Sequence, residues 1–317
     1  MIKMIDGIAA ILSSFVNELK CLVIGNLMRY LFIVNPIAGM GGKRKIPDLI
    51  KHAFRHNPAD ARVLFTRCQG DAKVIVKEYF DEFDVFVAVG GDGTTNEVVS
   101  VVAGSGKIMG LIPAGSGNAL GRELGISMTP STAIKDLLNA KIRTIDTGMV
   151  NNNLRFVNAC GLGFDEHIAR CFDHSVNRGP VSYISFVLKE FPVYNPNSYT
   201  IEVDGMKLSK TAFVLTIANT SQYGNNAFIA PKAILDDGIF DLCIMRPFPV
   251  GVAPEMIIRL LNKQLDTSKY CEYIKAKKVT VKGANLNFQI DGEPIANNHT
   301  VEITVDPLSL NILVPDK

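Results

Sequence analysis

A single carboxylate, Asp92, stands in a glycine-rich turn over residues 90–93. The largely apolar run 84–88 before the turn predicts a strand buried on both faces, and the segment 96–102 after it has helical spacing. Glycines let a backbone approach an anion closely, and the N-terminus of a helix offers free N–H groups. The pattern therefore predicts a phosphate site, in which Asp92 faces Mg²⁺ or a reacting hydroxyl group.

The same turn fits a second interpretation, because many glycine turns join strands to helices without binding a ligand. It is not a Walker A loop, since no Gly-Lys-Ser/Thr follows, and it lacks the spaced glycines of a dinucleotide fingerprint. Two more glycine-bearing loops follow apolar runs that end at Val34 and Ile112. Parallel sheets bind ligands beyond the carboxyl ends of their strands, so the three loops together favour a phosphate site.

These loops belong to an alternation of predicted strands and helices in the first half of the chain. Strands are expected at 31–34, 62–66, 84–88 and 108–112. Apolar residues at helical spacing lie between them, from Ile46 to Phe54 and from Ala72 to Phe80. The alternation predicts an α/β domain with a doubly wound parallel sheet.

After Arg143 strand-like runs dominate, which predicts a second, largely antiparallel domain of sandwich or barrel type. These runs are 144–150, 154–160, 198–203, 211–218, 240–246, 279–282, 286–290 and 301–305. Turn signals stand at Asp204-Gly205 and Asp237-Gly238, and helices are expected near 182–190 and 254–262. We expect the active site in the cleft between the two domains.

The composition fits two globular domains and argues against some classes of partner and site. The 317 residues are 47% hydrophobic, enough for two cores, and a net charge of +2 does not favour nucleic acid. The six cysteines include no CxxC pair, and the five histidines show no ligand spacing. We therefore expect reduced thiols of a cytoplasmic protein and no structural zinc site.

Residues 1–28 predict an amphipathic extension rather than a membrane span or a signal peptide. Apolar residues recur on one helical face, but Glu18 and Lys20 interrupt the run well short of about 20 apolar residues. Three interpretations stay open: a helix packed on the domain, an extension upstream of a start at Met28, and an anchor at the membrane surface.

Six segments of the chain carry a family resemblance. They are FIVNPIAGMGG (32–42), VAVGGDGTTNEVV (87–99), GLIPAGSGNALGRELGI (110–126), NACGLGFDEHIA (158–169), ILDDGIFDL (234–242) and IDGEP (290–294). In type and order they resemble the diacylglycerol kinase catalytic family, which also contains sphingosine kinases, ceramide kinases and bacterial lipid kinases. The resemblance runs from Arg29 to Val314.

The resemblance implies a fold that agrees with the change from alternating helices and strands to mostly strands after Arg143. It implies a phosphofructokinase-like α/β domain with a parallel sheet at 29–143, completed by a returning strand within 306–317. It implies a C-terminal antiparallel β-sandwich domain for the lipid substrate at 144–305. The extension 1–28 lies outside both.

The resemblance also implies a nucleotide site on the glycine loops. The matching positions are Asn35, Pro36, Gly39, Thr66, Gly90, Gly91, Asp92, Gly93, Thr94, Thr95, Asn96 and Ser116. The glycine backbones would cradle the phosphates, and Thr66, Thr95 and Ser116 would supply hydroxyl donors. Asp92 would help to organise Mg²⁺ and the reacting groups.

For the general base, the resemblance points to the Asp-Gly-Glu element with Asp291 and Glu293. This base must accept the proton of a lipid hydroxyl while the γ-phosphoryl group moves. The sequence leaves open which of the three catalytic candidates, Asp92, Asp291 and Glu293, takes this role.

Two further positions each have two interpretations. Asp237, with the backbone carbonyls of Ile234 and Ile239, matches a structural metal site of bacterial lipid kinases, and oxygen ligands suit Mg²⁺ or Ca²⁺. Asp237 is also part of a hairpin turn. Asp165 matches a region that faces the lipid headgroup in relatives, and aspartate is also a favoured helix N-cap.

The activity implied by the resemblance is ATP-dependent transfer of a γ-phosphoryl group to a lipid hydroxyl, with ATP and Mg²⁺ as cofactors. Diacylglycerol-type and sphingoid-base or ceramide-type acceptors both fit. The implied partners are a lipid at the membrane surface, reached by peripheral contact from the cytoplasm, and a second copy of the chain in a homodimer. The alternatives are an NAD kinase-like enzyme, which shares the Gly-Gly-Asp-Gly-Thr loop, and an inactive nucleotide-binding regulator.

Overall fold

A computed structural model describes residues 28–37, 45–55, 60–173, 180–284, 286–297 and 300–316. Its first domain contains four parallel strands in the order β2 (Ala61–Phe65), β1 (Tyr30–Val34), β3 (Val85–Gly90) and β4 (Ile108–Pro113). All residues of β1 and β3 are buried, which explains their uninterrupted apolar sequences. The predicted parallel sheet is confirmed.

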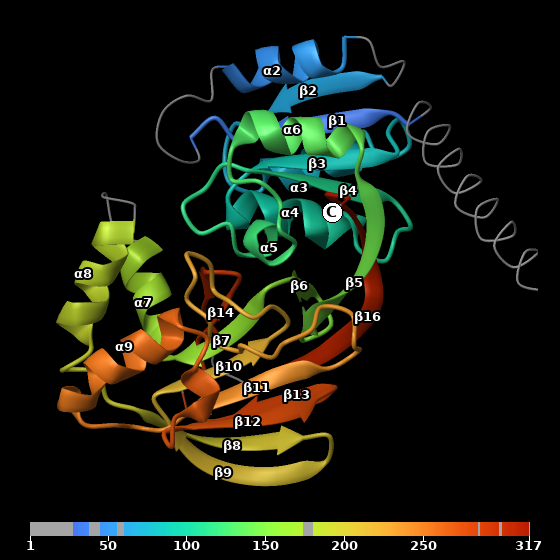
Figure 1. Ribbon diagram of the computed structural model, residues 1–317. Helices are drawn as coiled ribbons and strands as arrows, with labels where there is room; N and C mark the ends of the chain where they lie inside the picture. The colour runs from blue at the N-terminus through green and yellow to red at the C-terminus, as the bar shows by residue number, and fades with distance from the viewer. Residues whose placement is uncertain are drawn as a thin grey trace, which may run out of the picture.

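Helices separate these strands along the chain, as the alternation predicts. They are α2 (Ile46–Ala53), α3 (Asp71–Glu78), α4 (Asp92–Val102), α5 (Ala119–Glu123) and α6 (Pro130–Leu138). The helix α2 packs against α6, and α3 packs against α4 (Figure 1). The predicted extension 1–28 lies outside the described residues except for Met28, which packs against the core of this domain.

Two long strands belong to both domains. β16 (Val301–Val314) pairs in parallel with β4 near its end and antiparallel with β5 (Lys141–Val150) along most of its length. They run from the upper to the lower half of the molecule in Figure 1, and their register shifts between Asp306 and Leu310. The boundaries expected at 143/144 and 305/306 therefore fall inside strands.

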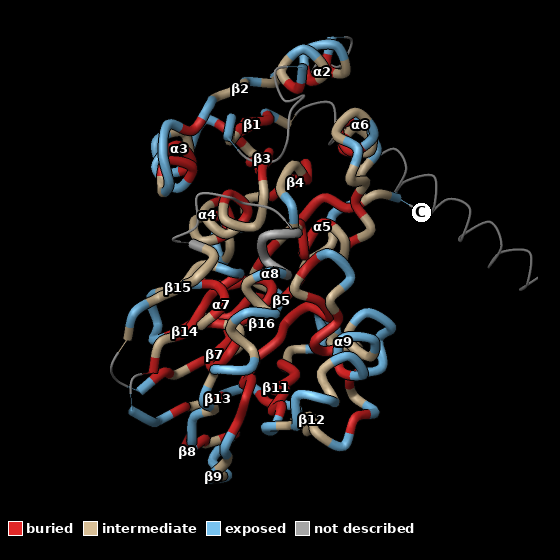
Figure 2. The backbone as a smooth tube through the Cα atoms, turned by 90° about the vertical axis from the view of Figure 1, so that its left-hand side faces the viewer, coloured by how far each residue is buried: buried red, intermediate tan, exposed pale blue. Residues whose placement is uncertain are grey.

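The second domain is a β-sandwich, as predicted. One layer continues the first sheet through β16, β13 (Lys278–Lys282), β8 (Asn197–Val203) and β9 (Met206–Ala212). The other has the order β12 (Cys271–Ala276), β11 (Phe240–Met245), β10 (Val214–Ala218), β7 (Ala159–Gly163), β14 (Phe288–Ile290) and β15 (Glu293–Ile295). One buried apolar cluster joins the two layers, and Figure 2 shows buried strands at its centre.

The structure differs from the sequence-based strands in several places. The run 211–218 is not one strand but the end of β9 and β10, which are separated at Phe213. The run 154–160 is not one strand but β6 (Leu154–Phe156) and β7, because the N–H groups of Val157 and Asn158 donate to Asp291 instead of to a neighbouring strand. β12 has no predicted counterpart, since its mixture of charged and apolar residues hides the alternation.

Three helices accompany the sandwich, namely α7 (Phe164–Asp173), α8 (Pro180–Glu190) and α9 (Ala253–Leu261). The last two confirm the helices expected near 182–190 and 254–262, whereas α7 was not predicted. Short 3-10 turns occupy Val250–Val252 and Leu265–Thr267. Among the helices of the described part of the chain, none has the length and apolar character needed to cross a membrane.

Candidate active site

The carboxyl ends of the parallel strands bring the predicted glycine loops to one edge of the sheet. Val34 pairs with Val89, and Gly90 with Pro113. The loops are tied together just beyond these pairs: the N–H of Asn35 donates to Val89 O at 3.0 Å, and that of Ala114 to Gly90 O at 2.7 Å. The edge predicted from the sequence is therefore confirmed.

Glycine is required in these loops because they touch one another. A β-carbon built on Gly91 would lie 3.2 Å from the Cα of Gly115, and one on Gly117 would lie 2.6 Å from Oδ2 of Asp92. A side chain at either position would push the loop after β3 away from the loop after β4. The glycines thus allow two backbones and one carboxylate to share a small volume.

Asp92 connects these two loops. Its Oδ2 accepts the N–H of Asn118 at 2.9 Å, and its Oδ1 accepts the N–H of Ala119 at 2.8 Å, both at the start of α5. Burial raises the pKa of Asp92 to about 6, and the nearby carboxylate of Asp291 acts in the same direction. A carboxylate has about four lone-pair sites, so Asp92 can hold the loop and still accept another donor or a cation.

The remaining predicted nucleotide residues lie around this edge. Thr66 is buried after β2, and Ser116 is exposed in the loop after β4. Asn35 Nδ2 donates to Thr94 Oγ1 at 3.2 Å, and the hydroxyl of Thr95 donates to Gly91 O at 3.0 Å, inside its own helix. Thr95 as placed therefore has no hydroxyl hydrogen left for a phosphate. Pro36 is exposed, and Gly39 lies outside the described residues.

Asp291 lies in the two-residue turn that joins β14 to β15. Both turn residues have positive φ, 50° for Asp291 and 90° for Gly292, which is the geometry of a type I′ hairpin. The carboxylate of Asp291 accepts the N–H groups of Val157, Asn158 and Ala159 at 3.0, 2.7 and 3.1 Å. Burial raises its pKa, and these donors oppose that rise. With so many bound donors, Asp291 holds the hairpin rather than offering a free base.

The hairpin of Asp291 also reaches the first domain. Asn96, which the resemblance marks as a nucleotide contact, donates its amide Nδ2 to Asp291 Oδ2 at 2.8 Å and to Arg155 O at 2.8 Å. The helix that follows the glycine turn is thereby bonded to the sandwich domain. Asn96 thus has a structural role at the boundary between the two domains.

Glu293 follows this turn and extends over the glycine turn of the first domain. A β-carbon built on Gly93 would lie 2.9 Å from Oε1 of Glu293, while Oε2 accepts the amide of Gln69 at 3.0 Å. Glu293 as a whole is half-buried. The structure therefore brings this carboxylate from the second domain to the first turn of α4.

Glu97 is a supporting residue of the site that the sequence analysis did not single out. It accepts the N–H groups of Gly70 at 2.7 Å and Ala72 at 3.0 Å, at the start of α3. These bonds hold the segment that carries Gln69 beside Glu293. The available signal was its position one turn after Gly93 in the same motif.

Asp165 lies at the start of α7 in a polar cluster that the sequence did not reveal. Its Oδ2 accepts hydrogen bonds from Tyr223 at 2.9 Å, Thr216 at 3.2 Å and Gln289 at 3.5 Å. Burial raises the pKa of Asp165 to about 7. Gln289 also accepts the N–H of Gly292 at 2.7 Å, so this cluster is continuous with the Asp291 hairpin.

The N-cap interpretation of Asp165 differs from the observed contacts. An N-cap side chain accepts an N–H two or three residues later, whereas Asp165 Oδ1 accepts the N–H of the next residue, Glu166, at 2.8 Å. Its other oxygen faces the polar cluster. The contact of Asp165 with the lipid headgroup stays a prediction.

The region of the predicted structural metal contains a lysine. Asp237 accepts the N–H of Ile239 at 3.3 Å, and the ammonium of Lys275 lies 3.4 Å from Asp237 Oδ2 and 2.8 Å from Asp241 Oδ2. This ammonium already neutralises the carboxylates, so the residues as placed do not favour an additional cation at Asp237, Ile234 and Ile239. That metal stays a prediction, and no step below depends on it.

Comparisons with known proteins agree with this architecture. Residues 29–150 match the family described as the diacylglycerol kinase catalytic domain. Residues 158–314 match the family described as the YegS C-terminal NAD kinase beta sandwich-like domain. The chain belongs to the diacylglycerol kinase catalytic family. The first match ends where β5 ends and the second begins just before β7, so together they cover both domains.

Relatives from this lipid kinase family align with the chain over most of their own length. The diacylglycerol kinase of Bacillus subtilis (strain 168) is 28% identical over 274 residues, 84% of this chain and 90% of the relative. A protein of Enterobacter sp. (strain 638) named "Probable lipid kinase YegS-like" is 27% identical over 292 residues, 87% of this chain and 94% of the relative.

Solved structures support the fold. The crystal structure of a diacylglycerol kinase from Bacillus anthracis str. Sterne has a TM-score of 0.69 at 19% identity, covering 90% of this chain and 97% of that chain. Another solved chain from that organism reaches 0.74 at 22% identity over the same shares. The family and the fold of this lipid kinase are thus shown by independent comparisons.

Proposed function

We propose that this lipid kinase transfers the γ-phosphoryl group of ATP to the hydroxyl of a diacylglycerol. The observation that carries the proposal is the position of Glu293, which comes from the second domain and lies over the glycine turn at Gly93. One carboxylate thus faces a phosphate cradle across a cleft between two domains. This is the arrangement that hydroxyl phosphorylation requires.

In this proposal Glu293 is the general base. It accepts the proton of the lipid hydroxyl while the γ-phosphoryl group passes to the hydroxyl oxygen. Gln69 orients the carboxylate through its 3.0 Å hydrogen bond, and Asp291 holds the hairpin that carries it. Asp291 itself is a positioning residue, because its oxygens are bound to backbone N–H groups and to Asn96.

The donors of the cleft fit a magnesium ion that enters with ATP. Mg²⁺ prefers oxygen ligands, and Asp92 supplies carboxylate oxygens at the glycine turn. When bound, the ion would neutralise charge on the transferring phosphoryl group. Asp92 would orient that group while it also holds the loop of Asn118 in place.

The acceptor proposal rests on the family and on the neutral character of the Asp165 cluster. Tyr223, Thr216 and Gln289 all present uncharged groups to Asp165, whose pKa of about 7 lets it stay partly protonated near neutral pH. A neutral diacylglycerol headgroup suits such a pocket wall. A sphingoid base, which carries an amine, is the alternative acceptor and would favour the ionised form of Asp165.

Exposed apolar side chains support an approach to the membrane surface by the sandwich domain. Leu188 on α8 is 63% exposed, and Ile258 and Leu261 on α9 are 58% and 50% exposed. The helices α7, α8 and α9 lie on the same side of the domain in Figure 1. We propose peripheral contact of this side with the cytoplasmic leaflet, so that the lipid reaches Asp165 from the bilayer.

The experiment is transfer of labelled phosphate from ATP to diacylglycerol, sphingosine, ceramide and NAD, with and without Mg²⁺. We expect label in diacylglycerol that depends on Mg²⁺. We also expect an Asp92→Asn variant to lose most of this activity while it keeps the wild-type circular dichroism spectrum. Label in NAD alone, or no transfer to any lipid, would refute the proposal.

A further inference from the structure

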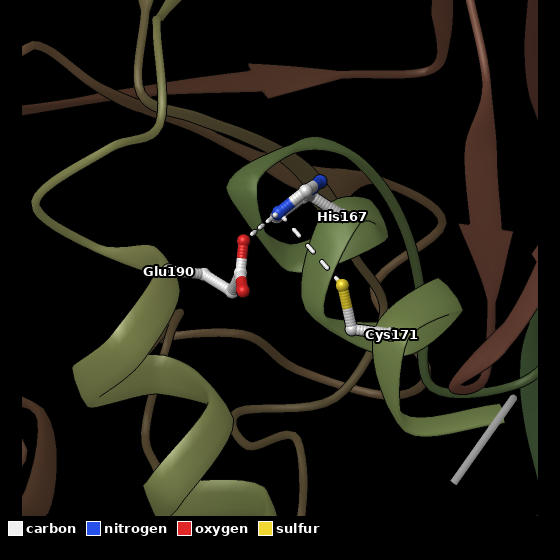
Figure 3. Close-up of side chains that lie close together, drawn as sticks. All are labelled: His167, Cys171 and Glu190. Carbon is white, nitrogen blue, oxygen red and sulfur yellow. Dashed lines mark hydrogen bonds and ion pairs between the residues drawn. The ribbon is translucent and has the colours of Figure 1, made fainter.

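A half-buried cluster of three potential metal ligands lies between α7 and α8, outside the cleft residues described above. His167 and Cys171 stand one turn apart on α7, and Glu190 is the last residue of α8. Figure 3 shows the three side chains pointing toward one another. The cysteines and histidines alone show no zinc-ligand spacing in the sequence, because the third group here is a glutamate from another helix.

The distances within this cluster approach those of a tetrahedral site. Oε2 of Glu190 lies 3.0 Å from Nε2 of His167, and Sγ of Cys171 lies 3.8 Å from the same nitrogen. All three ligand atoms lie within 4.8 Å of one another. Bond lengths of zinc to nitrogen, oxygen and sulfur put the edges of an ideal ligand tetrahedron at about 3.4–3.6 Å. The two distances to His167 therefore lie within about 0.4 Å of an ideal edge, and the edge from Glu190 to Cys171 would have to shorten by at most about 1.2 Å.

The chemistry of the three groups selects the kind of metal. Imidazole and thiolate suit zinc and its neighbours in the first transition row, whereas Mg²⁺ and Ca²⁺ prefer oxygen alone. We propose that His167, Cys171 and Glu190 bind a Zn²⁺ ion, with water as the fourth ligand. This site would be independent of the Mg²⁺ that the transfer reaction uses.

The proton balance of binding follows from the contacts. In the metal-free form the Nε2–H of His167 donates a hydrogen bond to Glu190, because Nδ1 faces the Arg170 donor. On binding, zinc takes this nitrogen, the imidazole hydrogen moves from Nε2 to Nδ1, and the Cys171 thiol releases one proton to solvent. Arg170, whose Nη2 lies 3.4 Å from Nδ1, must turn away, and its ion pair with Glu166 at 3.2 Å offers a position for it.

The surroundings hold the imidazole in place. The ring of His167 lies 5.2 Å from that of Tyr194 and 6.3 Å from that of Phe164, measured between centroids. Both rings belong to an aromatic cluster packed on the sandwich. The ligand orientation is therefore largely set before the ion arrives, which lowers the cost of binding.

A bound ion would hold α8 in a fixed position against α7, because its ligands come from both helices. α7 begins beside Asp165 and packs on β14 and β15, the two strands of the Asp291 hairpin. Zinc would thus stabilise the wall of the cleft through α7 without contacting the reacting groups. We assign it a structural role.

The test is titration of the chelator-treated full chain with Co²⁺, followed by competition with Zn²⁺. We expect one Co²⁺ per chain, with the intense visible bands of tetrahedral cobalt and a near-ultraviolet thiolate-to-cobalt absorption, both abolished by Zn²⁺. Native mass spectrometry should show one Zn²⁺ per chain. Hydrogen exchange in α7 and α8 should slow on zinc binding.

Variants identify the ligands. Cys171→Ser should remove the thiolate absorption, and both Cys171→Ser and His167→Asn should weaken Zn²⁺ binding by more than about 100-fold, beyond the effect typical of outer-shell partners. Cys68→Ser, at an exposed cysteine, and Cys271→Ser, at a half-buried one, are matched controls that should bind like the wild type.

Several results would overturn the proposal. They are failure of the wild type to bind one Co²⁺ or Zn²⁺ at micromolar concentration, and retention of the thiolate absorption in Cys171→Ser. Loss of binding in Cys271→Ser would also overturn it, because it would place the metal at another thiol. Circular dichroism of each variant establishes that a change in binding is not a loss of fold.

Discussion

Two hairpins of the sandwich domain have the same turn and different surroundings. Asp204-Gly205 joins β8 to β9 with φ of 47° and 90°, and Asp291-Gly292 joins β14 to β15 with φ of 50° and 90°. Each aspartate accepts backbone N–H groups from a neighbouring segment. For Asp204 these belong to Lys277 and Lys278, at 3.1 and 2.8 Å.

The difference lies in what each hairpin reaches. After Asp204-Gly205 comes Met206, which is 54% exposed. At the matching position after Asp291-Gly292 comes Glu293, which meets the glycine turn and Gln69 of the other domain. The Asp-Gly pair is therefore a structural element that recurs, and the chemistry comes from the residue after it and from the neighbour across the cleft.

The largest expected effect is on kcat, and it distinguishes the two hairpins at the residue that follows each Asp-Gly pair. Glu293→Gln keeps the size and the hydrogen bond to Gln69 but removes the base, so kcat for phosphate transfer should fall by about 10²–10⁴-fold. Its matched control is Met206→Gln, which should keep wild-type kcat. A Glu293→Gln enzyme within about threefold of wild-type kcat would show that another group accepts the proton.

A smaller effect, on stability and on kcat, should distinguish Asp291 from Asp204. Asp291→Asn replaces one acceptor oxygen by an N–H₂ group that faces either the donors of Val157 and Asn96 or those of Asn158 and Ala159, so it should lower the free energy of unfolding by about 1–3 kcal/mol. It should also reduce kcat, since Glu293 shifts. Asp204→Asn, at an exposed turn, should cost less than about 1 kcal/mol and leave kcat unchanged.

Urea denaturation of the two asparagine variants provides this measurement. Equal losses of stability would mean that the contacts of Asp291 across the domains add nothing to those of an ordinary hairpin. Unchanged kcat in Asp291→Asn would show that the hairpin does not position Glu293.

The smallest effect concerns Asp165, which contacts the Asp291 hairpin through Gln289. Burial raises the pKa of Asp165 from 3.8 to about 7, so ionisation opposes folding. Between these two pH values the unfolded chain has released the proton and the folded chain has kept it. The contribution of Asp165 to stability is therefore present at low pH and is lost as pH rises through about 7.

Asp165→Asn removes this ionisation, and the hydroxyl groups of Tyr223 and Thr216 can rotate to accept from the new amide. The Tm of the variant minus that of the wild type should increase by several degrees between about pH 4 and pH 7 and then level off. Differential scanning calorimetry across this range checks the shape. Parallel Tm curves for the two proteins would contradict the raised pKa.

The sequence predicted the parts of the site that depend on neighbouring residues. The strand before Gly90 and the loops after β3 and β4 were inferred from local patterns, and the structure confirms them. In the loop after β4, Asn118 accepts Gly115 N–H at 2.9 Å and donates to Gly115 O at 2.9 Å. Local patterns suffice here because each bond joins residues a few positions apart.

The sequence could not predict contacts between distant segments. The N–H donors of Asp291 lie more than 130 residues before it, so its positioning role was indistinguishable from a catalytic one. The polar cluster of Asp165 joins three separate strands or loops, and no spacing of residues in the sequence predicts it. Glu190 lies 23 residues from His167 and becomes its neighbour only because α8 returns along α7.

The strand β16 affects the order in which the protein is completed during synthesis. Asn311 and Ile312 pair with Ile108 and Met109 at the edge of β4, and they leave the ribosome only after every strand of the sandwich. Until then β4 presents an open edge to the cell, where other chains could pair with it. The sheet of the first domain is therefore completed only when β16 is made, although its other strands are made first. The same strand also completes the sandwich, so both domains depend on β16.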